Sequence, residues 1–100
     1  MTIEEMRNQL AAMIDEWNQR YLDGKETRNA LQFIRYHLPE APAMQWAPED
    51  HMENPYDMAD RLIADMDAFG VFNDVKDAMA GEEGVQTLEG IVDLMQGSSW

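Results

Sequence analysis

Apolar residues recur at steps of three and four along most of this 100-residue chain, and this spacing constrains its fold more than any other feature. Such spacing places the apolar side chains on one face of an α-helix, whereas a half-buried strand would need strict alternation. No alternating stretch long enough for a strand occurs in the sequence. We therefore predict an all-α protein, a compact bundle of four to five short helices.

Capping residues define the first predicted helix. Thr2 and Glu5 form a capping box, in which each side chain accepts a hydrogen bond from the other residue's backbone N–H. The apolar series that follows reaches Tyr21, and Gly24 suits the left-handed residue that follows a helix. We expect this helix to span about residues 3–22.

Four further segments show helical spacing between proline, glycine or capping residues. Asn54-Pro55 is a start signal, because asparagine caps a helix and proline fits its first position. Proline disfavours helix in the residue before it, so Pro39 ends the preceding helix. Gly90, inside the last segment, costs about 1 kcal/mol relative to alanine. The expected helices span about residues 26–38, 55–69, 72–80 and 85–96.

Residues 39–54 hold three prolines and are predicted to form an extended connector. Met44, Trp46 and Met52 are expected to anchor it on the core. Tryptophan is also enriched at interface hot spots, so Trp46 is equally a candidate contact with a partner.

The length and composition indicate a single small domain. One hundred residues suffice for one core, so we expect a helical domain over residues 1–100 with a loose tail over 97–100. No apolar run approaches the roughly 20 residues that cross a bilayer. Glu4 and Glu5 occupy positions where a signal peptide would be basic and then apolar. The chain has no cysteine, which excludes a disulfide framework, and a cytoplasmic location is expected.

The charge of the chain restricts its partners. Twenty acidic residues against seven basic ones give a net charge of −13. Nucleic acid and anionic membranes repel such a chain. We therefore expect no direct DNA binding and no membrane binding, but a protein partner with a basic, nucleic-acid-binding surface.

One segment resembles the start of a calcium-binding loop. Asp65, Asp67 and Gly70 fall at positions 1, 3 and 6 of such a loop. However, Phe69 falls at position 5, and Lys76 falls at position 12, where a bidentate glutamate is needed. A helix that ends at glycine explains the same residues, with Phe69 in the core, and we expect no metal or other cofactor.

Catalytic signatures are lacking in the sequence. His37 and His51 have no partner at the spacing of a metal site. The serines, Ser98 and Ser99, fall in the expected tail, and there is no cysteine nucleophile. Paired-carboxylate chemistry is not excluded, but acids are too frequent for their number to indicate it. We expect a protein that is not an enzyme.

Rows of carboxylates remain as the candidate binding surface. Seven acids and one base lie between residues 49 and 67. Asp57 and Asp60 would share one helix face about 5–6 Å apart, which is comparable to the spacing of phosphates along a nucleic-acid strand. The alternative, a solvated face that only keeps the protein soluble, fits equally well. The predicted partner-binding residues are Glu49, Asp50, Glu53, Asp57, Asp60, Trp46, Asp15 and Glu16.

A small, acidic, cysteine-free helical chain of this kind resembles the phage-encoded anti-CRISPR proteins that act on type I, especially type I-F, surveillance complexes. The opening Thr2-Ile3-Glu4-Glu5-Met6 and the acidic stretch Glu49–Asp67 suggest this similarity, which is one of type and not a motif match. The resemblance assigns no role to any residue. It implies binding to crRNA-loaded Cas proteins and a block of target DNA binding. The alternative is a helical phage chaperone or antitoxin-like regulatory module that masks a basic partner.

Overall fold

The computed structural model of this protein describes residues 1–46, 54–81 and 84–97. Within them the chain is all-helical, which confirms the predicted fold class. No helix among these residues is both long and apolar enough to span a membrane. The helices are α1 (Ile3–Leu22), α2 (Ala30–His37), α3 (Pro42–Gln45), α4 (Pro55–Ala68), α5 (Phe72–Ala80) and α6 (Leu88–Gly97).

The first helix, α1, begins and ends as predicted. The Thr2 hydroxyl accepts a hydrogen bond from the Glu5 N–H, and the Glu5 carboxylate accepts one from the Thr2 N–H, both at 3.1 Å. Past the other end, Gly24 has a φ of 78°, a conformation that favours glycine. The apolar face of α1 is buried and packs mainly against α4.

The second helix begins later than predicted, at Ala30 and not near Glu26. Asn29 caps it, accepting a hydrogen bond from the Gln32 N–H at 2.9 Å, while the Gln32 side chain accepts one from the Asn29 N–H at 3.0 Å. Glu26 instead pairs with Arg20 of α1. The reciprocal cap satisfies the first backbone N–H groups at this position and so fixes the start of the helix.

The predicted extended connector over residues 39–54 contains the short helix α3, so the prediction is wrong for this part. Pro42 occupies its first position, where a missing N–H costs nothing. The N-cap residue Ala41 has no side-chain oxygen to offer. The cap comes instead from Asp65 of α4, whose Oδ1 accepts the Ala43 N–H at 2.8 Å. A cap supplied from a distant helix leaves no local signal in the sequence.

The apolar residues of this connector divide between core and solvent. Met44 is fully buried, as expected. Trp46 is 83% exposed, so the prediction that it anchors the connector on the core is wrong. Met52 falls outside the described residues.

The next two helices, α4 and α5, agree with the prediction. The Asn54 side chain accepts a hydrogen bond from the Tyr56 N–H at 2.8 Å, and Pro55 is the first helical residue. Gly70 follows α4 with a φ of 73°. Because these signals act within a few residues, the sequence predicted them without knowledge of the fold.

The last helix, α6, begins at Leu88, after the predicted start at 85. It includes Gly97, which the prediction placed in a loose tail, and the rest of that tail falls outside the described residues. Thr87 provides the cap, since its hydroxyl accepts the Gly90 N–H at 3.1 Å. The glycine has a packing reason: a Cβ at position 90 would lie 2.6 Å from Cγ1 of Val85. Glycine therefore lets the segment before α6 fold back against its first turn.

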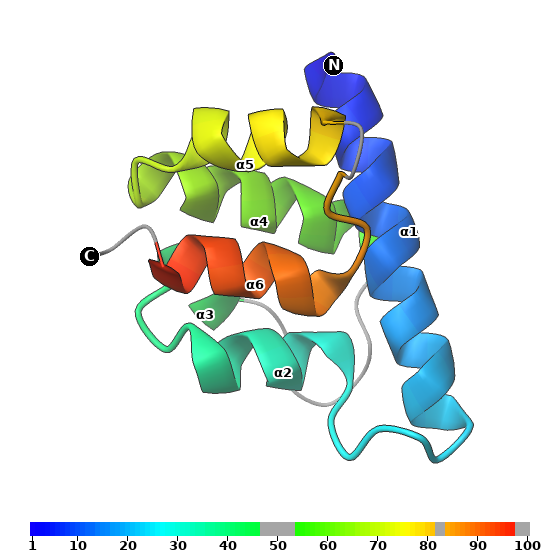
Figure 1. Cartoon of the computed structure of the whole chain (residues 1–100). Helices are drawn as coiled ribbons and strands as arrows, with labels where there is room; N and C mark the ends of the chain where they lie inside the picture. The colour runs from blue at the N-terminus through cyan, green and yellow to red at the C-terminus, as the bar shows by residue number, and fades with distance from the viewer. Residues whose placement is uncertain (47–53, 82–83, 98–100) are drawn as a thin grey trace.

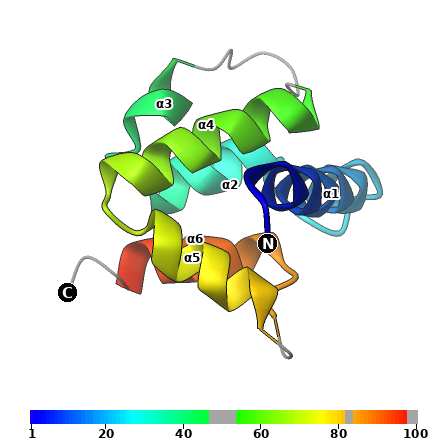
Figure 2. The same cartoon turned by 90° about the horizontal axis from the view of Figure 1, so that it is seen from above.

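The helices are arranged with three of them running in the same direction. Figures 1 and 2 show α2, α4 and α6 starting near α1 and ending at the opposite side of the molecule. Helix α5 lies beside α4 and runs in the opposite direction. The C-terminal ends of α2, α4 and α6 therefore gather at one end of the protein.

Candidate protein-binding surfaces

The short helix α3 is held at both ends by charged side chains from other helices. At its start, the Asp65 carboxylate accepts the Ala43 N–H. At its end, Arg61 of α4 donates to the Ala43 carbonyl at 3.1 Å. Arg35 of α2 donates from Nε to the Met44 carbonyl, also at 3.1 Å. These bonds satisfy groups that a helix of this length cannot satisfy internally.

The Asp65 side chain has a structural role and does not contribute to an acidic surface. The residue is fully buried. Burial raises the pKa of its carboxyl, while hydrogen bonds from the Ala43 and Met44 N–H groups and the charge of Arg61 partly oppose this shift. Within the described residues its Oδ2 has no hydrogen-bond partner. The segment from Asp65 to Gly70 is the last turn of α4 and its cap, which supports a helix end over a calcium loop.

Trp46 projects from the end of this fixed helix into solvent. It is the C-cap residue of α3 and has the largest exposed fraction of any large apolar residue described, 83%. By contrast, Trp17 is buried and donates its indole N–H to the Arg28 carbonyl at 2.8 Å. Of the two roles left open for Trp46, packing on the core is excluded, and contact with a partner is retained.

The predicted acidic row on α4 is partly neutralised within the protein. Asp57 and Asp60 are both exposed. Arg7 of α1 binds Asp60 through two hydrogen bonds, Nε to Oδ1 at 2.7 Å and Nη2 to Oδ2 at 3.2 Å. This contact raises the pKa of Arg7, and its guanidinium also lies 4.9 Å from the centre of the Tyr56 ring. The predicted residues Glu49, Asp50 and Glu53 fall outside the described part of the chain.

The two predicted acids of α1 lie away from that row. Asp15 and Glu16 are exposed, but consecutive residues point about 100° apart around a helix. Glu16 lines a small hollow with Arg20 and residues at the start of α6. Arg7 marks the point where α1 meets the acids of α4, and Asp15 and Glu16 follow it by eight and nine residues. This spacing corresponds to about 12 Å along the helix axis, a distance greater than the electrostatic screening length of about 8 Å at physiological salt. The acids on α1 and α4 therefore act as separate groups.

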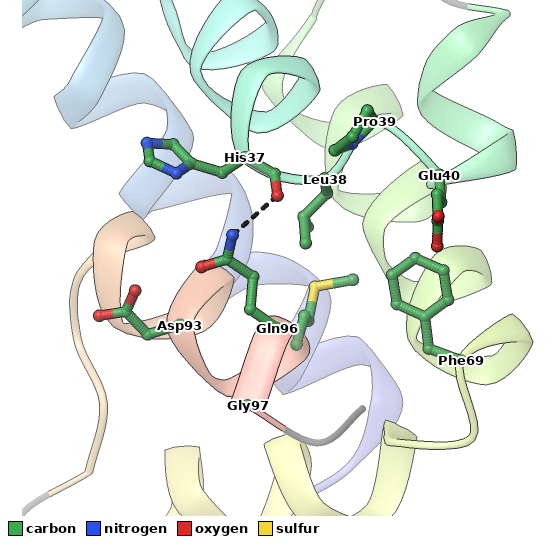
Figure 3. A pocket seen from close by; sticks show the side chains of 9 residues that line it. His37, Leu38, Pro39, Glu40, Phe69, Asp93, Gln96 and Gly97 are labelled. Atoms are coloured by element: carbon green, nitrogen blue, oxygen red, sulfur yellow. Dashed lines mark hydrogen bonds between the residues drawn. The ribbon is translucent and has the colours of Figure 1, made fainter. Parts of the chain in front are cut away.

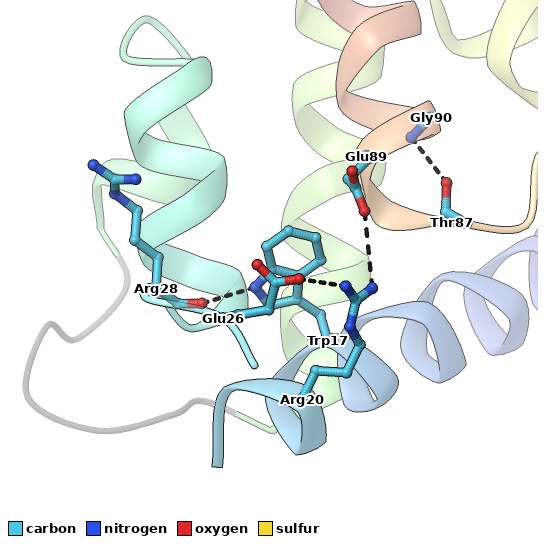
Figure 4. A network of polar contacts seen from close by, with 7 residues as sticks. All are labelled: Trp17, Arg20, Glu26, Arg28, Thr87, Glu89 and Gly90. Atoms are coloured by element: carbon cyan, nitrogen blue, oxygen red, sulfur yellow. Dashed lines mark hydrogen bonds and ion pairs between the residues drawn. The ribbon is translucent and has the colours of Figure 1, made fainter. Parts of the chain in front are cut away.

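Other carboxylates hold the fold together around Arg20 (Figure 4). Arg20 pairs with Glu26 in the segment before α2 and approaches Glu89 of α6 at 3.9 Å. Its guanidinium also lies 5.5 Å from the centre of the Trp17 ring. This network joins the end of α1 to the start of α6, so Glu26 and Glu89 are partly committed to internal contacts.

An open hollow of about 750 Å³ lies where α2, α4 and α6 end, and we call it the C-terminal hollow. Its apolar lining includes Leu38 and Met95, which are 5% and 1% exposed. Figure 3 shows Glu40 and Asp93 on opposite sides of it. Its lining residues are His37, Leu38, Pro39, Glu40, Phe69, Asp93, Met95, Gln96 and Gly97.

Sequence reasoning missed the C-terminal hollow because its residues come from the ends of three separated helices. One signal was visible: Asp67 and Asp93 lie in or near the last turns of α4 and α6, where acids are disfavoured by the helix dipole. Gln96 closes one side by donating to the His37 carbonyl at 2.8 Å.

The described residues contain no group of three or more side chains placed to hold a metal ion. His37 is engaged in ring contacts, 4.7 Å from Phe33 and 5.0 Å from Tyr36 between ring centres. His51 falls outside the described residues.

Comparison with known proteins does not assign the chain to a group. No protein-family model, curated protein or solved structure matches it. The charge and the surface of the chain are therefore the features that bear on its function.

Proposed function

We propose that this chain is a non-enzymatic binding protein that occupies a basic, nucleic-acid-binding surface on a protein partner. The observation that carries the proposal is the net charge of −13, displayed mainly at the surface. Among the described carboxylates only Asp65 is buried. A basic groove that normally holds nucleic acid attracts such a surface through the same charge complementarity.

The surface we propose differs from a single row on α4. Asp60 is neutralised by Arg7 and Asp65 is buried, so neither offers a free negative charge to a partner. The exposed acids that we expect to face the partner lie on three helices. They are Asp57 and Asp67 of α4, Asp74 and Asp77 of α5, and Asp93 of α6.

The most specific form of the proposal is an inhibitor of a type I RNA-guided surveillance complex. Cas proteins hold guide and target strands in basic channels, so an acidic protein of this size can compete with target DNA for such a channel. This form is supported by the size, charge and helical class of the chain.

The test is competition with target DNA on a purified type I-F Cas–crRNA complex at two salt concentrations. We expect bound protein to exclude target DNA, and affinity to fall as salt rises. The variant Asp57→Lys/Asp67→Lys/Asp77→Lys should bind at least tenfold more weakly. Asp60 is left unchanged, because replacing it would also remove the α1–α4 ion pair.

The matched control changes the same amount of charge elsewhere, at Glu4, Asp15 and Asp23 on or beside α1. It should bind more strongly than the α4–α5 variant, and both must retain helical circular dichroism. No binding to the complex would refute the inhibitor form. Equal loss in both variants would show that net charge, and not this surface, determines binding.

A second candidate is a helical assembly or regulatory module that masks a basic partner mainly through apolar contact. The exposure of Trp46 at the end of a rigidly held helix favours it. In that case Trp46→Ala should weaken partner binding more than any change of acid, and binding should depend little on salt. Salt-sensitive binding that tolerates Trp46→Ala would exclude this candidate.

A further inference from the structure

The C-terminal hollow lies at an electrostatically negative end of the molecule. α2, α4 and α6 all end beside it, and each helix C-terminus carries roughly half a negative charge from its aligned peptide dipoles. α5 and the four-residue α3 start on this side, so their N-termini oppose part of the effect. Three C-termini against these two N-termini, one of them from a single helical turn, leave a net preference for a cation.

The helices that end there supply little positive charge of their own. Of these helices, α2 has Arg35 and His37 in its last turn. The last turns of α4 and α6 hold no basic residue. Figure 3 shows the His37 imidazole directed away from the hollow, while its carbonyl faces Gln96. The usual cation at a helix C-terminus is therefore missing at two of the three ends.

The shape and lining of the hollow fit a long basic side chain. Phe69, which is partly exposed, offers apolar surface for a hydrocarbon stem beside the nearly buried Leu38 and Met95. Glu40 and Asp93 lie at the rim, one on each side, and give the opening of the hollow a negative charge for a cationic head. Arginine and lysine combine these two parts, with an apolar stem and a hydrated cationic end. An anion would be repelled here, and a wholly apolar ligand would leave both carboxylates without a counter-charge.

We infer that the C-terminal hollow binds an arginine or lysine side chain of the protein partner. This inference rests on the proposed function and adds to it a point of contact and the chemistry of the contacting residue. The partner's basic surface would then be held by one inserted side chain, with the exposed acids around it adding long-range attraction.

The probe is N-acetyl-arginine amide, with the neutral isostere N-acetyl-citrulline amide as its control, titrated into ¹⁵N-labelled protein. We expect saturable shifts at the Gln96 side-chain amide and the Glu40 backbone, with a Kd on the order of 1 mM for a ligand of this size. The citrulline compound should give at least fivefold weaker binding, because it lacks the charge.

Two variants with equal charge change locate the site. Glu40→Gln/Asp93→Asn should weaken arginine binding about fivefold or more. Glu4→Gln/Asp23→Asn, on or beside α1, removes the same charge from two exposed positions outside the lining residues and should leave the affinity within twofold. Equal effects in both variants, or shifts spread over all acidic helices, would overturn the inference.

A variant ending at Gly97 tests the other occupant, the last three residues of this chain. Tighter arginine binding by that variant would assign the hollow to the chain's own tail and overturn the inference. The result of the arginine titration can be told apart from the result of the DNA-competition test of the proposed function. Salt-dependent competition with DNA can persist when the hollow fails to bind arginine, and arginine binding can persist when the Cas complex is not bound.

Discussion

Asp65 offers the sharpest test of how this fold is held together, because a fully buried carboxylate caps a helix to which it does not belong. Replacing Asp65 by alanine removes the acceptor at 2.8 Å from the Ala43 nitrogen. The loss of this one hydrogen bond costs about 0.5–2 kcal/mol if it acts as an ordinary N-cap, and about 1–3 kcal/mol if the freed N–H is shielded from water. Relief of a buried charge offsets part of this, so we expect a net loss of about 1–3 kcal/mol at pH 7.

Asparagine at position 65 separates the hydrogen bond from the charge. It keeps an oxygen for the Ala43 N–H and places an uncharged group where Oδ2 has no hydrogen-bond partner among the described residues. Stability at pH 7 should stay within about 1 kcal/mol of the parent or rise.

The pH dependence follows from the direction of the pKa shift. Burial raises the pKa of Asp65, so the folded state holds this proton more tightly than the unfolded state. The stabilising contribution of the carboxyl is therefore complete below the unfolded pKa, near 3.8, and is lost as pH rises through the higher folded value. The advantage of Asp65→Asn over the parent should grow from pH 4 upward and then level off.

The assay is urea unfolding followed by circular dichroism between pH 4 and pH 8. Asp67→Asn, two residues away and exposed, is the control and should change stability by about 0.5 kcal/mol or less. If Asp65→Asn destabilises as much as Asp65→Ala at pH 7, the negative charge itself is stabilising, and the reasoning is refuted.

Three further changes test other contacts. Gly90→Ala should lower the free energy of unfolding by about 1 kcal/mol despite alanine's better helix propensity, because the new Cβ would lie 2.6 Å from Cγ1 of Val85. The same change should become stabilising in a Val85→Ala background, and urea unfolding of the variants can show both effects. Arg7→Ala should lower the Tm at low salt and have little effect in 1 M salt, because its contact with Asp60 is exposed and screened; equal loss at both salt levels would contradict this. Thr2→Ala should cost about 1 kcal/mol or less and fray only the start of α1, which hydrogen exchange can locate.

Elements defined by short-range chemistry were predictable from the sequence. The capping box at Thr2, the cap and proline at Asn54 and the glycine after α4 each act within one turn. The start of α2 was also local, since Asn29 and Gln32 are three residues apart, but the prediction overlooked that pair. All-α class followed from periodicity, because the apolar stripe of a helix is formed before any tertiary contact.

The candidate binding surfaces were much less predictable. The acids at positions 57, 60 and 65 look alike in the sequence, yet one is exposed, one is bound by Arg7 and one is buried as a cap for α3. Arg7 and Asp60 are 53 residues apart, so no local pattern could pair them. The exposure of Trp46 likewise follows from how α3 is held and not from its neighbours in sequence.

The sequence by itself therefore determined the five longer helices, most of their ends and the large negative charge. These depend on backbone hydrogen bonds within a turn and on composition, which folding does not change. Only the tertiary structure decided which carboxylates remain free and where helix dipoles accumulate. Those properties depend on which helices run in the same direction and on which side chains of different helices contact one another. The C-terminal hollow exists only because α2, α4 and α6 end at the same place.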